Sequence, residues 1–257
     1  MKGEPLMLIH PTLDQLRTLR LTGMLKALEE QMQMPDIDSL SFEQRLGLMA
    51  DREITERQNR HLKTRLRKAN LRQSASVEDI DYLHPRGLDK ALVAKLQSCD
   101  WIKEHHNLII TGPTGTGKTF LACALAHKAC REGLSALYVR IPRLLQDLFI
   151  SKGDGRYGKL LKSISKTDLL LLDDWGMSKI TSEQSRDLLE IIDDRHALRS
   201  TLITSQFPVD HWHELIEDPT LADAILDRII HNAYKINLKG DSMRKKKSKL
   251  TQPPHKD

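Results

Sequence analysis

From residue 107 onward, short apolar runs alternate with longer segments whose apolar residues recur at helical spacing. The apolar runs predict five β-strands, at Leu108–Thr111, Ala136–Arg140, Asp168–Asp173, Thr201–Ser205 and Ala233–Leu238. The segments between them predict helices near residues 118–132, 142–165, 181–199 and 209–231. Strands that alternate with helices usually pair in parallel and are covered on both faces. The pattern therefore predicts an α/β domain with a five-stranded parallel sheet over residues 107–240.

The pattern before residue 107 is helical. Residues 11–33 carry one apolar helical face, formed by Leu21, Met24, Leu25, Leu28 and Met32. Ser41 and Gln44 have the spacing of a capping box, and they predict a second helix that runs to about Ala69. We expect a small all-α domain over residues 1–72 and a linker with a short helix over residues 73–106. Residues 241–257 are basic and low in apolar residues, which predicts a disordered tail.

Charge is unevenly distributed along this chain of 257 residues, whose formal net charge is +5. Eight Lys/Arg and two Glu lie between Arg52 and Arg72, and seven Lys/Arg and two Asp lie between Lys239 and Asp257. Two basic segments on an otherwise acidic body favour binding of nucleic acid, although a solvated helix face and a solubilising tail would give the same pattern. The candidate DNA-binding residues are Arg57, Arg60, Lys63, Arg65, Arg67, Lys68 and Arg72.

Two classes of protein are disfavoured by the composition. The three cysteines have the spacing of neither a disulfide framework nor a zinc site. No apolar run approaches the length of a membrane-spanning helix, and the N-terminus lacks the apolar core of a signal peptide. We expect a cytoplasmic protein with reduced thiols and no membrane partner.

The segment GPTGTGKT, Gly112–Thr119, matches the P-loop pattern in full and lies between a predicted strand and a predicted helix. Glycines let backbone N–H groups approach phosphate oxygens closely, and the helix N-terminus favours negative charge. Lys118 would contact the β- and γ-phosphates, and the Thr119 hydroxyl would bind Mg²⁺. The predicted nucleotide-binding residues are Gly112, Pro113, Thr114, Gly115, Thr116, Gly117, Lys118 and Thr119.

The segment DLLLLDDWG, residues 168–176, predicts a buried strand with two carboxylates at its C-terminal end. Ligands of open parallel sheets bind at that end of the strands. Adjacent carboxylates beside bound phosphate are costly unless a metal ion is present. Asp173 would then hold Mg²⁺, and Asp174 would orient or deprotonate an attacking water. A capped strand end with two surface carboxylates is the alternative.

Three further positions are candidate catalytic residues. The strand at 201–205 ends so that Ser205 or Gln206 could contact the γ-phosphate or the water, although a simple turn before Pro208 fits as well. Arg228, on a predicted helix, could reach a neighbouring subunit's γ-phosphate as an arginine finger, and Arg244 could contact phosphate within the same subunit. Ion pairs with Asp223 or Asp227 compete as the role of Arg228.

Taken together, these residues resemble the IstB family, the ATP-binding helper proteins of insertion-sequence transposition, and more distantly the DnaC-type helicase loaders. Both are AAA+ ATPases. The segments LRLTGMLKALEEQ and RLGLMADREITERQNRHLKTRLRKANL resemble the N-terminal region of the IstB family. The stretch STLITSQFPVDHWHELIEDPTLADAILDRIIHNAYKINLKGDSMRKKK resembles its C-terminal signature.

The resemblance implies roles for the residues singled out above. It makes Asp173 and Asp174 the Walker B pair, although most AAA+ proteins have Glu where this chain has Asp174. Ser205 and Gln206 fall where sensor 1 is expected. Arg228 is similar in position to the arginine finger, and Arg244 to the sensor 2 arginine. The separate helical lid of many AAA+ proteins is expected to be absent or minimal.

The implied activity is hydrolysis of ATP with Mg²⁺ by a homo-oligomer whose subunits share each nucleotide site. By the same resemblance, the oligomer assembles on double-stranded target DNA and recruits a partner transposase. A helicase loader would bind single strands, and no Phe, Tyr or Trp for base stacking lies between Arg52 and Arg72. A nucleotide-dependent interaction switch with negligible hydrolysis and a small-molecule kinase would also use a P-loop.

Overall fold

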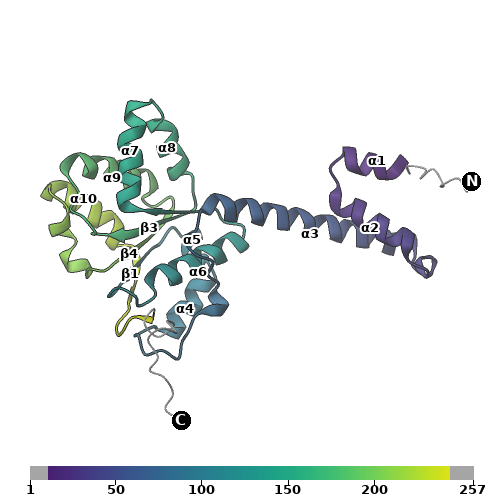
Figure 1. Ribbon diagram of the computed structural model, residues 1–257, viewed down its shortest axis with the longest axis horizontal. Helices are drawn as coiled ribbons and strands as arrows, with labels where there is room; N and C mark the ends of the chain where they lie inside the picture. Colours follow the sequence, from purple (N-terminus) through teal and green to yellow (C-terminus); the bar gives the residue numbers. More distant parts are fainter. Residues whose placement is uncertain (1–10, 244–257) are drawn as a thin grey trace, which may run out of the picture. The chain divides into compact units, whose positions relative to one another are not determined.

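The computed structural model describes residues 11–243, and it divides the chain into two units, Met1–Thr64 and Arg65–Asp257. We call these unit 1 and unit 2. The division lies inside the long helix α3 (Phe42–Ala69), before the predicted boundary at residue 72. Figure 1 shows the helices of unit 1 and the layered sheet of unit 2.

Unit 1 is helical, as predicted. It contains α1 (Pro11–Thr18), α2 (Thr22–Gln33), a short 3₁₀ turn η1 (Ile37–Ser39) and most of α3. The single helical face expected over residues 11–33 belongs to two helices, because the backbone at Arg20 turns to a φ of 59° between them. The capping box at the start of α3 is confirmed: Ser41 N donates to Gln44 Oε1 at 2.8 Å, and Gln44 N donates to Ser41 Oγ at 3.3 Å.

The two longer helices of unit 1 meet at a glycine. A Cβ at Gly23 would overlap the backbone of Glu53, so α2 approaches α3 more closely than any other residue would allow. The buried Glu53 carboxylate accepts hydrogen bonds from Gly23 N at 2.7 Å and Met24 N at 3.3 Å. A side chain of α3 therefore satisfies backbone donors in the first turn of α2.

The described part of unit 2 contains one sheet of five parallel strands in the order β2-β3-β4-β1-β5. The strands are β1 (Asn107–Thr111), β2 (Ala136–Arg140), β3 (Leu169–Trp175), β4 (Ser200–Ser205) and β5 (Ala233–Asn237). Each overlaps its predicted position, and the predicted α/β fold class is confirmed. Because β1 and β3 both flank β4, the ends of these three strands lie together at one edge of the sheet.

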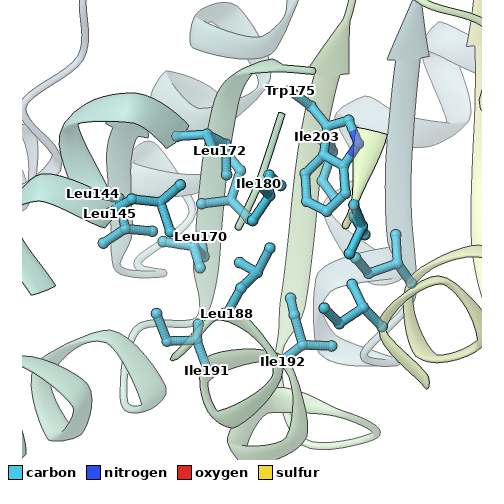
Figure 2. Packing of buried hydrophobic residues seen from close by; sticks show 14 of the residues in the cluster. Leu144, Leu145, Leu170, Leu172, Trp175, Ile180, Leu188, Ile191, Ile192 and Ile203 are labelled. Atoms are coloured by element: carbon cyan, nitrogen blue, oxygen red, sulfur yellow. The ribbon is translucent and has the colours of Figure 1, made fainter. Parts of the chain in front are cut away.

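Helices cover both faces of the sheet (Figure 1). One face packs against α6 (Lys118–Arg131), with α4 (Lys90–Gln97) and α5 (Asp100–Lys103) nearby. The other face is covered by α7 (Ile141–Gly153), α8 (Tyr157–Ser165), α9 (Ser182–Arg195) and α10 (Pro219–Ile230). Figure 2 shows this second core, where Leu170 and Leu172 of β3 meet Leu144 of α7 and Ile191 of α9.

Two predicted helices of unit 2 are interrupted. The helix expected over 142–165 is α7 and α8, because Gly155 between them has a φ of 73°. The helix expected over 209–231 is two 3₁₀ turns, η3 (Val209–His211) and η4 (His213–Leu215), followed by α10. Asp218 caps α10 and accepts hydrogen bonds from the N–H groups of its first turn.

Residues 73–106, predicted as a linker with a short helix, lie within unit 2. They contain the 3₁₀ turn η2 (Val77–Asp79) as well as α4 and α5, and Ala75, Val77 and Ile80 are buried. This segment packs against α6, and its residues Gln73, Asp79, Asp81 and Arg86 line the cavity described below. Among residues 11–243, no helix has both the length and the apolar character needed to cross a membrane.

Candidate nucleotide-binding site

The loop between β1 and α6 has the P-loop sequence, and its three glycines all have positive φ. At Gly112 φ is 144°, and a Cβ there would overlap the carbonyl oxygen of Leu238. At Gly115 φ is 88°, and a Cβ would overlap the side chain of Ser242. The loop therefore packs closely against the segment that follows β5, in a conformation that other residues rarely adopt.

The P-loop ends where α6 begins, so the N-terminal N–H groups of this helix face the loop. Lys118 is buried, and its Nζ donates to the carbonyl oxygens of Gly112 at 2.6 Å and Pro113 at 2.9 Å. The next residue, Thr119, donates through Oγ1 to Asp173 Oδ1 at 3.0 Å. The loop thus brings a cation, a hydroxyl and a helix N-terminus together, as binding of a triphosphate requires.

Asp173 lies on β3 and is fully buried. Besides Thr119, its carboxylate accepts hydrogen bonds from Tyr138 Oη at 2.7 Å, from Arg72 Nη1 at 3.5 Å and from Thr204 Oγ1. Burial, together with the bond to Asp173, raises the pKa of Tyr138, so its hydroxyl stays protonated and donates at neutral pH. These donors compensate the loss of water around a buried carboxylate.

Asp174 follows at the end of β3 and has a φ of 64°, which is unusual for a residue other than glycine. Its carboxylate accepts from Arg140 Nε at 2.6 Å and lies 3.6 Å from Arg72 Nη1. Adjacent side chains of a regular strand point to opposite faces. Here the pairing with β4 shifts between Leu172 and Trp175, and both carboxylates reach the same guanidinium, that of Arg72.

Arg72, Lys118, Thr119, Arg140 and Asp174 line a cavity of about 320 Å³, a size typical of small-molecule sites. Its walls come from the P-loop, from the ends of β2, β3 and β4, and from residues 72–86 and Met243. Arg86 is fully buried behind the loop, where it donates to Thr116 O at 3.0 Å and to Asp81 O at 3.0 Å. The segment before β1 therefore supports the P-loop directly.

Only one of the two predicted sensor residues reaches the cavity. Gln206 lines it and accepts from Thr114 Oγ1 of the P-loop at 2.6 Å. Ser205 is buried instead, where it donates to Trp175 O at 2.9 Å and accepts from Phe207 N at 3.0 Å. Its hydroxyl stabilises the turn after β4. This agrees with the alternative interpretation of the sequence, a simple turn before Pro208.

Arg228 lies on α10 and does not line the cavity of its own chain. It forms an ion pair with Asp193 of α9, and its Nη1 donates to Ala224 O at 2.8 Å. The partners expected for such a pair, Asp223 and Asp227, lie instead near His213 and His231. Arg244 lies outside the described residues.

The candidate DNA-binding residues differ in their surroundings. In unit 1, Lys63 is exposed, Arg57 Nε donates to Glu53 at 2.6 Å, and Arg60 Nη2 donates to Thr22 at 2.6 Å. In unit 2, Arg67 and Lys68 are exposed, whereas Arg65 Nε donates to Cys130 O at 2.9 Å. Arg72, which the charge pattern grouped with this set, lies in the nucleotide cavity.

Several residues at the site were not singled out from the sequence. They are Tyr138, Arg140 and Thr204, which sit at or near strand ends, and Arg86, which precedes α4. The rule that ligands bind at the C-terminal ends of parallel strands could have indicated Arg140, the last residue of the predicted second strand. No local pattern distinguishes Arg86 from the neighbouring surface charges.

Known proteins that are similar to this chain are described as ATP-binding proteins, which fits a nucleotide site at the P-loop. A family model described as "IstB-like ATP binding protein" matches residues 14–251. The "Putative insertion sequence ATP-binding protein y4pL" of Sinorhizobium fredii is 52% identical over 239 residues, which cover 93% of this chain and 98% of that protein. The "Insertion sequence IS1162 putative ATP-binding protein" of Pseudomonas fluorescens is 52% identical over 203 residues, which cover 79% and 88%.

Two solved structures share the fold. The crystal structure of DnaI matches with a TM-score of 0.56 and 27% identity, over 65% of this chain and 92% of DnaI. The DnaC helicase loader matches with a TM-score of 0.52 and 24% identity, over 62% of this chain and 95% of that protein. The sheet is therefore that of a P-loop AAA+ ATPase, as predicted. With the family model matching nearly its whole length, the chain belongs to the family of IstB-like ATP binding proteins.

Proposed function

We propose that this protein is a cytoplasmic, ATP-dependent DNA-binding regulator of transposition that oligomerises on duplex target DNA and recruits or stimulates a transposase. One observation carries the proposal: Lys118, Thr119 and Asp174 line one cavity, and Thr119 donates to the buried Asp173, in a chain of which 93% aligns with an insertion-sequence ATP-binding protein. The names of the relatives support a link to insertion sequences, and the residues of the cavity support binding and hydrolysis of ATP.

The residues present fit a magnesium ion. The Thr119 hydroxyl and a carboxylate oxygen of Asp173 are 3.0 Å apart beside the P-loop, and oxygen ligands of this kind suit Mg²⁺. When bound, Mg²⁺ would neutralise charge on the β- and γ-phosphates. Lys118 would leave its two carbonyl partners to contact the phosphates. Asp174, partly exposed at the cavity wall, would orient or deprotonate the water that hydrolyses ATP.

Oligomerisation is supported by the position of Arg228. Its guanidinium lies on α10 and does not line the nucleotide cavity of its own chain, so as an arginine finger it would act on a neighbouring subunit's nucleotide. To act as an arginine finger it would exchange Asp193 for a γ-phosphate. ATP bound between subunits would then favour assembly.

Binding to DNA is supported by the basic residues of α3. Lys63, Arg67 and Lys68 are exposed and would contact phosphates without reading sequence. Arg57, Arg60 and Arg65 have protein partners and would add charge with less freedom to move. Each phosphate contact contributes to the salt dependence of binding.

A helicase loader is the second candidate, because the DnaC helicase loader shares the fold of this chain. Such a protein would bind single strands and a helicase. The basic stretch of α3 contains no aromatic residue for base stacking, which disfavours single-strand recognition. The two functions therefore predict different nucleic-acid preferences for the same nucleotide site.

The test is equilibrium binding to single- and double-stranded DNA of increasing length, with ATP and with ADP, at two salt concentrations. The proposal predicts cooperative, length-dependent duplex binding that requires ATP and weakens with salt. Lys118→Ala is the control, and we expect it to lose ATP turnover by about a hundredfold or more, as for other groups that stabilise transition-state charge. The proposed coupling is contradicted if this variant binds duplex DNA equally well with and without ATP, and as tightly as the wild type does with ATP. Binding confined to single strands supports the loader.

A further inference from the structure

Arg72 lies where the basic helix meets the nucleotide cavity. Helix α3 ends at Ala69, Asn70 turns the chain with a φ of 49°, and Arg72 enters the cavity two residues later. Its Nη1 is 3.5 Å from Asp173 Oδ2 and 3.6 Å from Asp174 Oδ2. One guanidinium thus bridges both carboxylates at the end of β3.

The other arginine at this edge has a different role. Arg140 contacts Asp174 alone, at 2.6 Å, and it is the last residue of a strand of the sheet. Arg72 also contacts Asp173, the carboxylate that adjoins Thr119, and it lies on a coil segment outside the sheet. Of these two arginines, Arg72 is the one that meets the proposed magnesium ligand.

Arg72 and a magnesium ion would compete for Asp173. The Oδ2 atom that Arg72 contacts already accepts a hydrogen bond from Tyr138, and Thr119 lies 3.2 Å from the same atom. A guanidinium and a divalent cation on one carboxylate repel each other. Arg72 would therefore leave Asp173 when Mg²⁺ and ATP enter, and the phosphates of ATP would offer it negative charge in the same cavity.

The C-terminal end of α3 contacts α6, the helix that follows the P-loop. A movement of Arg72 would therefore affect the end of α3. Ala69 is fully buried, and Arg65 Nε donates to the carbonyl oxygen of Cys130 near the end of α6 at 2.9 Å. The exposed Arg67 and Lys68 lie between these two anchored residues. Arg72 follows Lys68 by only four residues.

We propose that Arg72 is a positioning residue that neutralises Asp173 and Asp174 while Mg²⁺ is absent and exchanges to the nucleotide when Mg²⁺ and ATP bind. The exchange would couple nucleotide state to the basic end of α3. This second step rests on the proposed function, whereas the exchange itself concerns the nucleotide site alone.

The test is a magnesium titration of nucleotide binding, followed with a fluorescent, non-hydrolysable ATP analogue, on the full-length wild type and Arg72→Gln. Removing the competing cation should lower the Mg²⁺ concentration at half-maximal binding by about three- to fivefold, the effect of one partly exposed ion pair. Arg72→Lys keeps the charge and should return most of the wild-type midpoint. The same proteins are then assayed for duplex DNA binding with ATP and ADP.

Arg67→Gln is the matched control, because it removes the same charge from the same helix end outside the cavity. It should weaken duplex binding by the same factor with both nucleotides and leave the Mg²⁺ midpoint unchanged. Arg72→Gln should instead bring the ATP and ADP affinities for DNA close together. An unchanged Mg²⁺ midpoint in Arg72→Gln overturns the proposal. Equal duplex binding of wild-type protein with ATP and ADP is a different result, and it contradicts the proposed function.

Discussion

The two units of this chain bury very different amounts of apolar side chain. Of the buried hydrophobic residues among residues 11–243, only Leu16 and Ala27 lie in unit 1. Unit 2 buries residues of all five strands and the inner faces of the helices around them. Unit 1 nevertheless exposes about as many large hydrophobic residues as the much longer unit 2, namely Leu19, Met32, Met34, Phe42, Leu46, Leu48 and Ile54.

Each of the two units is therefore held together by a different kind of contact. In unit 2 the buried strands hold the chemistry, since Asp173 and Asp174 are placed by the leucines that precede them in β3. In unit 1 polar contacts carry much of the packing, since Glu53 and Gln31 are among its few buried side chains. Stability in unit 2 should therefore depend on apolar volume, and stability in unit 1 on hydrogen bonds.

The largest expected effect is in the core of unit 2. Leu170→Ala removes a fully buried side chain that packs against α7 and α9 (Figure 2), and we expect a loss of about 2–5 kcal/mol of unfolding free energy. The matched control is Leu48→Ala on α3, where the side chain is 51% exposed and the expected change is within about 0.5 kcal/mol.

Urea denaturation can assign these losses to a unit. The three tryptophans, Trp101, Trp175 and Trp212, all lie in unit 2, so tryptophan fluorescence follows that unit alone. Circular dichroism at 222 nm follows the helices of both. Comparable losses for Leu170→Ala and Leu48→Ala would contradict the contrast between the units.

The fold of unit 2 was predictable because its strands are continuous apolar runs. Each predicted strand overlaps an observed one. The two carboxylates were correctly predicted at the C-terminal end of β3 from the segment DLLLLDD. The errors came where a local interruption overrode periodicity, as at Arg20 and Gly155. Residues 73–106 were underestimated because their buried positions are isolated and form no regular apolar face.

The site was predictable only as far as local motifs reach. The P-loop and the carboxylate pair are contiguous in sequence, so spacing alone indicated them. Arg72, Tyr138 and Thr204 come to Asp173 from three separate segments: the strand order places Tyr138 and Thr204, and the coil after α3 places Arg72. A basic residue at the end of a basic helix resembles its neighbours, which is why Arg72 was grouped with the DNA-binding residues.

The next effect tests the polar packing of unit 1. Burial raises the pKa of Glu53, but hydrogen bonds from Arg57, Gly23 and Met24 outweigh it and leave the pKa lowered from 4.5. A lowered pKa in the folded state means that the carboxylate stabilises unit 1 above its unfolded pKa. That contribution is lost as pH falls below about 4.5 and through the folded pKa.

Glu53→Gln should therefore cost about 1–2 kcal/mol at pH 7, because a neutral acceptor replaces a charged one. Circular dichroism should register the loss, tryptophan fluorescence should not, and the acid-dependent part of the helical transition should shrink. The control is Glu30→Gln, whose exposed carboxylate lies 3.4 Å from Arg52 and whose loss should be within about 0.5 kcal/mol. Equal effects of the two substitutions would argue against a special role for the buried carboxylate.

The smallest expected effect concerns the apolar residues that unit 1 exposes. Phe42, the first residue of α3, is 73% exposed, so Phe42→Ser should change the unfolding free energy by less than about 0.5 kcal/mol at any protein concentration. Circular dichroism of urea unfolding at micromolar and at tenfold higher concentration checks this. A larger loss that grows with concentration would mean that another copy of the chain covers Phe42 in solution, because binding stabilises the folded state by mass action. Unit 1 would then bury its apolar residues by association, and the contrast with unit 2 would hold for the single chain alone.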